Sequence, residues 1–321
     1  MAKRYPMAAN FLSYKRINRD QYKVVNWLTE EEYTVGSHVA ILLKNLDGKK
    51  NPYSIQCHMS RSEIKEAIAQ LDEAELLRDS MTLMKEFGSY YRTVFITKWT
   101  KAKRVLAYFT NLFLLFLFVP VFIAGLFLAR NIDMDCTSRT MIVGTLLGVL
   151  PGIVLHEWSH GAACVAYGGR VFEFGLMISH FIPGGYTLMD TSRIKKKFHL
   201  VQINAAGIES NILFAGLLLA LSSVTPILCD ELYYAGIMNI SLAIVNFAFF
   251  DGLDGMNIIS SLLGIEDLKS KIKMVIKCPS IRKKISNSGL EGKVAVASSY
   301  MIYLQPLLVI PTIILFEVLY L

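Results

Sequence analysis

Long apolar runs divide this chain into a polar first part and a hydrophobic remainder. The first hundred residues are of mixed polarity, and a boundary falls near Trp99–Arg104. Because a helix rises about 1.5 Å per residue, about 20 apolar residues cross a hydrocarbon core of about 30 Å. Five runs reach or approach that length, whereas Met256–Leu263 is too short to cross alone. The five runs are Val105–Ala129, Met141–Tyr167, Leu200–Leu228, Tyr233–Phe250 and Val294–Leu321.

The polar first part has the pattern of a small α+β domain. β-forming residues predict a strand pair and one later strand, and a short apolar-faced helix follows the pair. The strands are Tyr22–Val25, Tyr33–Val35 and Tyr90–Trp99, and the helix is His38–Leu46, ended by Asp47-Gly48. Ser60 and Glu63 form a capping box, so a second helix begins there. Ile64, Ile68 and Leu71 give that helix an apolar face.

Composition and charge agree with a membrane protein. Hydrophobic residues make up 53% of the 321 residues and charged residues only 18%, against about a quarter charged in soluble domains. The net charge is +7, which indicates basic cytoplasmic loops rather than nucleic-acid binding, because no basic stripe with interleaved aromatic residues is present. A polar stretch follows Met1, so we expect no signal peptide and a cytoplasmic N-terminal region.

The charges of the loops predict an orientation. The basic flanks are Lys101–Arg104, Arg193–Lys197 and Lys269–Lys284, and the acidic loops contain Asp133, Asp135, Asp230 and Glu231. Cytoplasmic loops are enriched in Lys and Arg, so this order places the N-terminus inside and the C-terminus outside. None of the five cysteines forms a CxxC pair, which argues against a cysteine zinc site. Cys136 and Cys229 would both lie outside, where a disulfide between them is an open alternative.

The second apolar run contains an HExxH motif, His156-Glu157-Trp158-Ser159-His160. Positions i and i+4 share one face of a helix, so both imidazoles can bind one metal ion. Glu157 is then placed to take a proton from water activated by that metal. A chance match to the motif is the alternative. However, two histidines and a glutamate inside an apolar run cost free energy when they are placed in a membrane, and such residues are usually functional.

A zinc hydrolase needs a third protein ligand from elsewhere in the chain. The candidate is Asp254, in Leu253-Asp254-Gly255 at the cytoplasmic end of the fourth run, with Asp251 as its rival. Either aspartate can instead end a helix, as in the same tripeptide Leu46-Asp47-Gly48 of the polar part.

These motifs resemble the site-2 protease family of intramembrane zinc metalloproteases, from about Leu147 to Gly255. That family pairs HExxH with a later Asn-x-x-Pro-x-x-x-Leu-Asp-Gly, matched here from Asn246 to Gly255 with Phe249 in place of proline. An intervening Gly-Pro-x-x-Asn element is matched by Gly207 to Asn211, with Ile208 in place of proline. The resemblance implies a polytopic α-helical domain of about five to six transmembrane helices over residues 101–321. It also implies Zn²⁺ held by His156, His160 and Asp254, with Glu157 catalytic.

The resemblance implies roles for further polar residues. Asn211 and Asn246 would hold the substrate carbonyl or stabilise an oxyanion, or else would only hydrogen-bond between helices. Glu209 either lines the site or pairs with a polar neighbour. Val171–Leu188 resembles the family's re-entrant β-hairpin, whose edge can pair with an extended substrate. His180 in that segment is expected to be structural.

The polar part resembles winged-helix domains that bind the leader peptides of ribosomally made, modified peptides. The similarity covers Tyr22–Leu77 and lies in the strand pair followed by the two helices. It implies a cytoplasmic peptide-recognition domain over residues 1–100, in which a leader adds as a strand. A packing or regulatory domain is the alternative.

The leading hypothesis is therefore a zinc metalloendopeptidase that cuts at the cytoplasmic side of the membrane and matures a ribosomally made peptide precursor. A second hypothesis is regulated proteolysis of a membrane-anchored regulator. A third is a non-catalytic relative in peptide export or immunity, against which the intact Glu157 argues.

Overall fold

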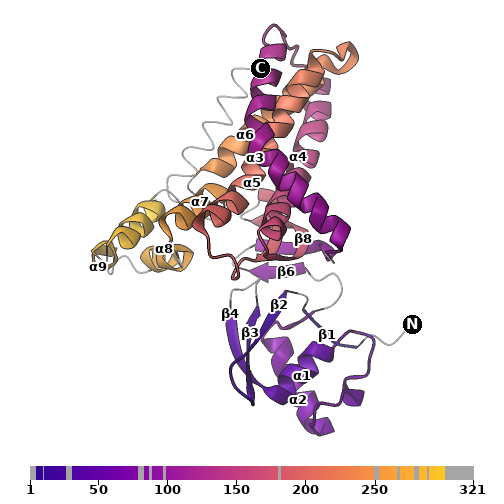
Figure 1. Ribbon diagram of the computed structural model, residues 1–321, viewed down its shortest axis with the longest axis vertical. Coiled ribbons are helices and arrows are strands. Elements are labelled where there is room, and N and C mark those ends of the chain that lie inside the picture. Colours follow the sequence, from indigo (N-terminus) through magenta and orange to yellow (C-terminus); the bar gives the residue numbers. More distant parts are fainter. Residues whose placement is uncertain are drawn as a thin grey trace. The chain divides into compact units, whose positions relative to one another are not determined.

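The computed structural model divides the chain into two compact units. It describes residues 5–9, 11–26, 31–78, 83–86, 89–96, 99–179, 182–248, 253–265, 268–277, 282–287 and 289–300. The first unit comprises Met1–Trp99 with Gly169–Asp190, and the second comprises Thr100–Gly168 with Thr191–Leu321. Helices dominate the second unit, whereas every strand within the described residues belongs to the first (Figure 1).

The first unit contains a three-stranded antiparallel meander. Its strands are β2 (Leu12–Arg16), β3 (Gln21–Asn26) and β4 (Glu31–Gly36), in that order. Val24 faces Tyr33 in the register of β3 and β4, which confirms the predicted strand pair. Strand β2 was not predicted, although the turn before β3 has a recognisable signal. There the Asn18 Oδ1 accepts a hydrogen bond from the Asp20 backbone N–H at 2.9 Å.

The two predicted helices are present, and their buried residues share one core with the meander. Helix α1 (Ser37–Asn45) ends before Gly48, which has a positive φ of 75°. Helix α2 (Arg61–Glu73) begins with a complete capping box between Ser60 and Glu63. The hydrogen bond from the Ser60 backbone N–H lowers the pKa of the Glu63 carboxyl below its usual value. A short pair, β1 (Met7–Ala8) with β5 (Leu77–Arg78), completes the domain. Its core includes Phe11, Val24, Leu42, Leu43, Ile64, Leu71 and Leu76.

A second sheet joins segments that lie far apart in the sequence. Its antiparallel strands are β6 (Leu83–Glu86), β7 (Ser89–Ile96), β8 (Arg170–Ser179) and β9 (Ile182–Asp190), in that order. The strand predicted within Tyr90–Trp99 and the hairpin predicted within Val171–Leu188 are both present. The hairpin belongs to the first unit because β7 pairs with β8, whereas the sequence placed all residues after 100 in one domain. His180 lies outside the described residues.

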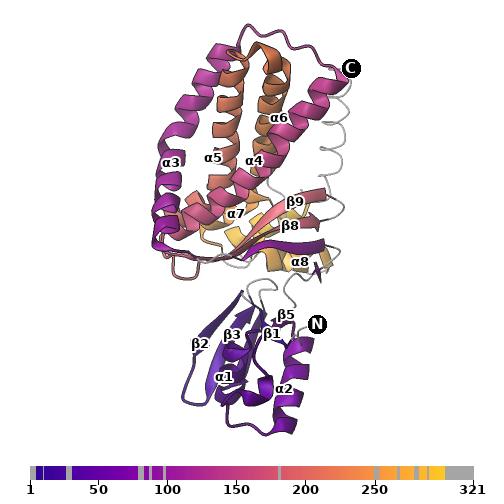
Figure 2. The same cartoon turned by 90° about the vertical axis from the view of Figure 1, so that its right-hand side faces the viewer.

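Four long helices form the second unit and lie side by side (Figures 1 and 2). They are α3 (Lys101–Ala129), α4 (Ser138–Ala166), α5 (Lys197–Ser222) and α6 (Cys229–Phe247). Each is long and apolar enough to cross a membrane, α6 together with the short turn that starts at Pro226. The most apolar stretch of α3 is only 17% buried, whereas that of α5 is 61% buried. Helix α5 is therefore the centre of the bundle, and α3 presents a largely exposed apolar surface.

Two of the predicted runs differ from the helices that the structure contains. The third run was predicted to reach Leu228, but α5 ends at Ser222 and a 3-10 turn covers Pro226–Leu228. This prediction was wrong because the ring of Pro226 disfavours helical backbone at the preceding residue. The last run, Val294–Leu321, lies outside the described residues beyond position 300, and residues 290–300 are helical. Cys136 and Cys229 are both free thiols.

Small residues bring the long helices close together. On α4, a Cβ atom added at Gly148 would lie 2.7 Å from the Ala235 carbonyl oxygen of α6. One added at Gly152 would lie 2.3 Å from Asn239 Oδ1. Asn239 Nδ2 donates to the Gly148 carbonyl oxygen at 3.0 Å, so α4 and α6 are also hydrogen-bonded across this contact. Close approach of this kind is typical of helix pairs in membranes.

Short helices follow the bundle and precede the helical residues 290–300. They are α7 (Asp254–Leu263), α8 (Leu268–Lys277) and α9 (Arg282–Ser286). Helix α7 is attached to α5, because Asn204 Nδ2 donates to Ser261 Oγ at 2.9 Å and to the Asn257 carbonyl oxygen at 3.2 Å. Its ten residues agree with the prediction of a stretch too short to cross a membrane.

Candidate metal centre

The two histidines of the HExxH motif lie one turn apart on α4 and face the same side. Their Nε2 atoms are 3.1 Å apart, and their ring planes are inclined at 80°. Only 7% of the surface of His156 and 5% of that of His160 is exposed. The helix brings the two imidazoles together because positions four residues apart share one face.

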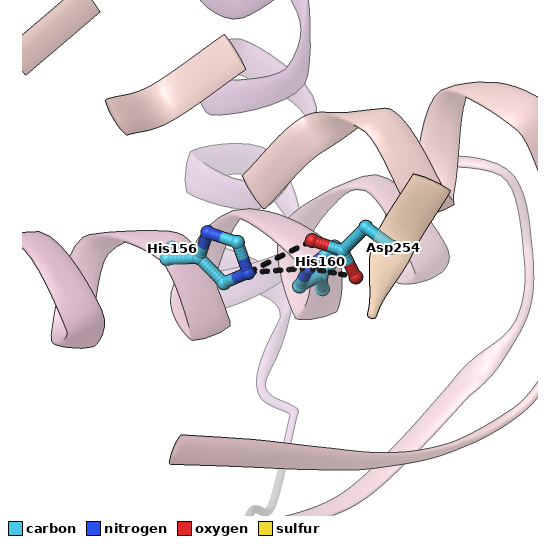
Figure 3. A group of neighbouring side chains, drawn as sticks. All are labelled: His156, His160 and Asp254. Atoms are coloured by element: carbon cyan, nitrogen blue, oxygen red, sulfur yellow. Dashed lines mark hydrogen bonds and ion pairs between the residues drawn. The ribbon is translucent and has the colours of Figure 1, made fainter. Parts of the chain in front are cut away.

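Asp254 reaches the same point from the first residue of α7 (Figure 3). Its Oδ2 atom is 3.0 Å from His156 Nε2, and its Oδ1 atom is 3.3 Å from His160 Nε2. Gly255 makes this approach possible, because a Cβ atom there would lie 2.2 Å from the Phe247 carbonyl oxygen at the end of α6. The rival ligand, Asp251, lies outside the described residues.

The donor set fits a zinc ion. Tetrahedral zinc with bonds of about 2.0–2.1 Å places neighbouring ligand atoms about 3.3 Å apart. The two Nε2 atoms are 3.1 Å apart, and each contacts a different oxygen of the Asp254 carboxylate, at 3.0 Å for His156 and 3.3 Å for His160. One ligand atom from each residue therefore lies within 4.8 Å of the other two. Asp254 Oδ2 is buried and no hydrogen-bond donor is aligned with it, although His156 Nε2 is near. A buried carboxylate oxygen without an aligned donor is costly unless a cation offsets its charge.

The outer ring nitrogen of each histidine has a hydrogen-bond partner on α5. His160 Nδ1 donates to the Ile203 carbonyl oxygen at 2.7 Å, and Asn211 Nδ2 lies 3.1 Å from His156 Nδ1. Because a carbonyl oxygen only accepts, neutral His160 carries its proton on Nδ1 and directs the Nε2 lone pair at the cluster. Partners of this kind orient metal ligands in zinc sites.

Comparisons with known proteins leave the family open. No protein-family model matches the chain, and neither the curated proteins nor the solved structures gave a significant match. Membership of the site-2 protease family therefore stays a prediction.

The asparagines proposed to contact substrate make hydrogen bonds within the protein. Asn211 is 1% exposed and contacts His156 of the neighbouring helix, which is the helix–helix alternative. Asn246 is half-buried and donates to the Leu242 carbonyl oxygen of its own helix at 3.1 Å. A substrate role for either residue stays a prediction.

Two glutamates of the helix bundle, Glu157 and Glu209, have different surroundings. Glu157 is half-buried and directly follows His156 on α4. Glu209 accepts a hydrogen bond from Gln202 Nε2 at 2.6 Å, so it pairs with a polar neighbour, one of the two roles proposed for it. Gln202 lies two turns earlier on the same helix, α5.

Gly207 is a site residue that sequence reasoning missed. A Cβ atom added to it would lie 2.4 Å from His160 Nε2, 2.5 Å from His156 Cε1 and 2.6 Å from His156 Nε2. Its missing side chain therefore leaves the space that both imidazoles occupy. The signal was the spacing of four residues to Asn211, which places both on one face of α5.

The other described histidines have partners of their own. His199 stacks on Tyr167, with ring centroids 4.1 Å apart. His38 Nδ1 is 3.0 Å from the Cys57 carbonyl oxygen in the first unit. Among the described residues, only His156, His160 and Asp254 bring three ligand atoms together.

Proposed function

We propose that this chain is a multi-pass membrane zinc metalloendopeptidase, similar to site-2 proteases, that hydrolyses a peptide bond at the cytoplasmic side of the membrane. The observation that carries the proposal is the triangle of ligand atoms from His156, His160 and Asp254. Glu157 follows the first ligand directly, which is the arrangement found in HExxH metalloproteases. Two imidazoles and one carboxylate suit zinc and leave a fourth position for a reactant.

The membrane location rests on the four apolar helices, and the orientation rests on charge. Residues 268–300 contain eight Lys or Arg and one Glu, a net charge of +7 that equals the net charge of the whole chain. The basic stretch Lys195–Lys197 lies at the start of α5, and Lys197 Nζ donates to the Leu263 carbonyl oxygen of α7 at 3.4 Å. The same end of the bundle therefore carries both basic segments. By the positive-inside rule that end is cytoplasmic, and the N-terminus lies on the same side.

In the proposed reaction, three residues would bind the metal and Glu157 would transfer a proton. His156, His160 and Asp254 would hold the metal, and a bound zinc would supply a Lewis acid that polarises a peptide carbonyl and acidifies water. The Glu157 carboxylate takes one proton from the attacking water and returns it to the nitrogen of the leaving amine. The water oxygen would bond to the carbonyl carbon first, and the C–N bond would then break as the amine nitrogen takes up the proton from Glu157. The second proton of the water stays with the new carboxyl group, so one water is consumed per peptide bond.

Metal content and cleavage, measured on the same variants, test this proposal. The purified protein in detergent should contain about one zinc per chain, and His160→Ala and Asp254→Asn should weaken its retention. Glu157→Gln should keep the zinc and lose cleavage of an unfolded protein substrate. Glu231→Gln is the matched control, because its carboxylate pairs with Arg139 at 2.9 Å at the far end of α6. A wild-type chain that binds no zinc after loading would refute the proposal.

The first unit favours a peptide precursor as the substrate. Among the described residues, β2 and β4 are the edges of its three-stranded sheet, and an extended leader peptide can add to such an edge. A membrane-anchored regulator is the alternative substrate, and its capture by the Glu157→Gln variant would favour regulated proteolysis. A non-catalytic role in export or immunity would be supported if the zinc-loaded wild type cleaved neither kind of substrate.

A further inference from the structure

The hydrogen bonds around the two histidines form a continuous line between two residues of α5. Asn211 Nδ2 is 3.1 Å from His156 Nδ1, His156 Nε2 is 3.1 Å from His160 Nε2, and His160 Nδ1 is 2.7 Å from the Ile203 carbonyl oxygen. All four groups belong to buried side chains or to the backbone of a buried residue. The direction of each hydrogen bond therefore depends on the others.

Only one arrangement of protons satisfies this line when both imidazoles are neutral. The Ile203 carbonyl accepts, so His160 carries its proton on Nδ1 and its Nε2 must accept. His156 must then donate from Nε2, and its Nδ1 accepts from the Asn211 amide. The tautomer of His156 in this arrangement carries its proton on the nitrogen that faces Asp254.

Metal binding requires the opposite tautomer of His156. A ligating Nε2 has no proton, so a neutral His156 must carry its proton on Nδ1. The nearest partner of Nδ1 is the Asn211 carboxamide, which then has to accept through Oδ1. Both ends of a carboxamide have nearly the same shape, so rotation by half a turn about its last bond exchanges donor for acceptor. Asn211 Oδ1 has no other partner that would hold the amide in one orientation.

We propose that Asn211 is a positioning residue that switches the tautomer of His156 when the site is loaded. The inference rests on the proposed zinc site. In the unloaded site the amide donates to His156 Nδ1, and in the loaded site it accepts from the same atom. His160 needs no such change. The hydrogen bond to the Ile203 carbonyl keeps the proton of His160 on Nδ1 in both cases, so its Nε2 carries no proton. The two histidines of the motif are therefore not equivalent.

Three substitutions separate this role from ordinary packing. Asn211→Leu keeps the same number of side-chain heavy atoms, with two larger methyl groups in place of Oδ1 and Nδ2, and provides neither donor nor acceptor. It should lower zinc affinity by about 10- to 100-fold, the usual effect of losing a partner of a metal ligand. Asn211→Asp can only accept, so it should bind zinc at least as tightly as the wild type. Asn111→Leu is the matched control on α3, because Asn111 is also buried with an unpaired Oδ1, and it should leave the affinity unchanged.

The experiment combines zinc affinity, from competition with a chromophoric chelator, with nitrogen NMR of the full-length protein. The chain has six histidines, so selective ¹⁵N-histidine labelling gives few signals, which His→Gln variants can assign. In the wild type, His156 should change from the Nε2–H to the Nδ1–H form when zinc is added. In Asn211→Asp it should be Nδ1–H before and after zinc.

The possible failures are distinguishable. A wild-type chain that never binds zinc overturns the proposed function, and the switch with it. A wild-type chain that binds zinc, while Asn211→Leu binds it equally well, overturns the switch alone. Detection of Nδ1–H on His156 of the wild type both with and without zinc also overturns the switch alone.

Discussion

Replacing Gly207 with alanine should abolish tight zinc binding without unfolding the bundle. The added methyl carbon would lie between 2.4 and 2.6 Å from three atoms of the two imidazoles, whereas ordinary carbon contacts are about 3.5–4.0 Å. Relief of this overlap requires a displacement of roughly 1 Å between α5 and the imidazoles. Metal sites tolerate errors of about 0.2 Å in ligand distances, so the displacement is several times too large.

The magnitude follows from these distances. We expect zinc affinity to fall at least 100-fold, equivalent to about 2.7 kcal/mol. Overpacking itself should cost about 1–3 kcal/mol of unfolding free energy, which a bundle of this size can absorb. The assay is competition for zinc against a chelator of known affinity, with helix content followed by circular dichroism on the same sample.

Gly236→Ala separates loss of the site from general overpacking. Its methyl carbon would lie 2.9 Å from Leu219 Cγ, in the contact between α5 and α6, and it would touch neither histidine. This variant should lose some stability and keep its zinc. If Gly207→Ala bound zinc as tightly as the wild type, the close packing of α5 against the two imidazoles would be refuted.

Three further predictions concern stability. Removal of zinc with a chelator should lower the midpoint of thermal unfolding, and added zinc should restore it. The physical reason is that a ligand at 1,000 times its Kd stabilises the folded state by about 4 kcal/mol. The midpoint of His160→Ala should not respond to zinc. Gly148→Leu should lower the same midpoint, because the backbone of Ala235 blocks the added side chain and α4 must move away from α6. Gly36→Ala should leave the midpoint unchanged, because the space around Gly36 is open. Glu63→Ala should reduce the hydrogen-exchange protection of the first turn of α2 at neutral pH. Because the pKa of Glu63 is lower in the folded chain, its contribution is present above the usual glutamate pKa and is lost as pH falls through the lowered value, so wild type and variant should converge in acid.

The sequence predicted those helices and turns that are determined by residues close together in the chain. The capping box of Ser60 and Glu63, the stop at Gly48 and the four long apolar helices all result from interactions within a few residues. The two histidine ligands were predicted for the same reason, because a spacing of four on a helix fixes their relation. The position of Asp254 at the end of the fourth apolar run made it a candidate, but its preference over Asp251 rested mostly on the resemblance to a known family. Nothing local distinguishes it from the aspartate of a turn such as Asp47.

Long-range pairing was beyond the reach of the sequence pattern. Strand β7 pairs with β8 across more than 70 residues, and Tyr91 faces Met177 in their register. Both strands are rich in β-forming residues, but a strand pattern does not specify its partner. The same holds for Asn211, whose type suggested a polar role but not the contact with His156 Nδ1, since that contact depends on the rotation of α5 about its axis.

The spacing of residues on α4 explains how one helix serves both packing and chemistry. Gly144, Gly148 and Gly152 are followed at the same interval by His156 and His160. Four residues advance a helix by about 400°, so each step in this row turns about 40° further around the axis. The early positions accordingly face α6, where Tyr234, Ala235 and Asn239 pack against them. The later positions face α5, where the histidines contact Gly207, Asn211 and the Ile203 carbonyl. The glycines let α6 approach α4, and α6 ends where Gly255 packs against the Phe247 carbonyl oxygen. A wider contact at Gly148 would therefore move the start of α7, and Asp254 with it, away from the imidazoles.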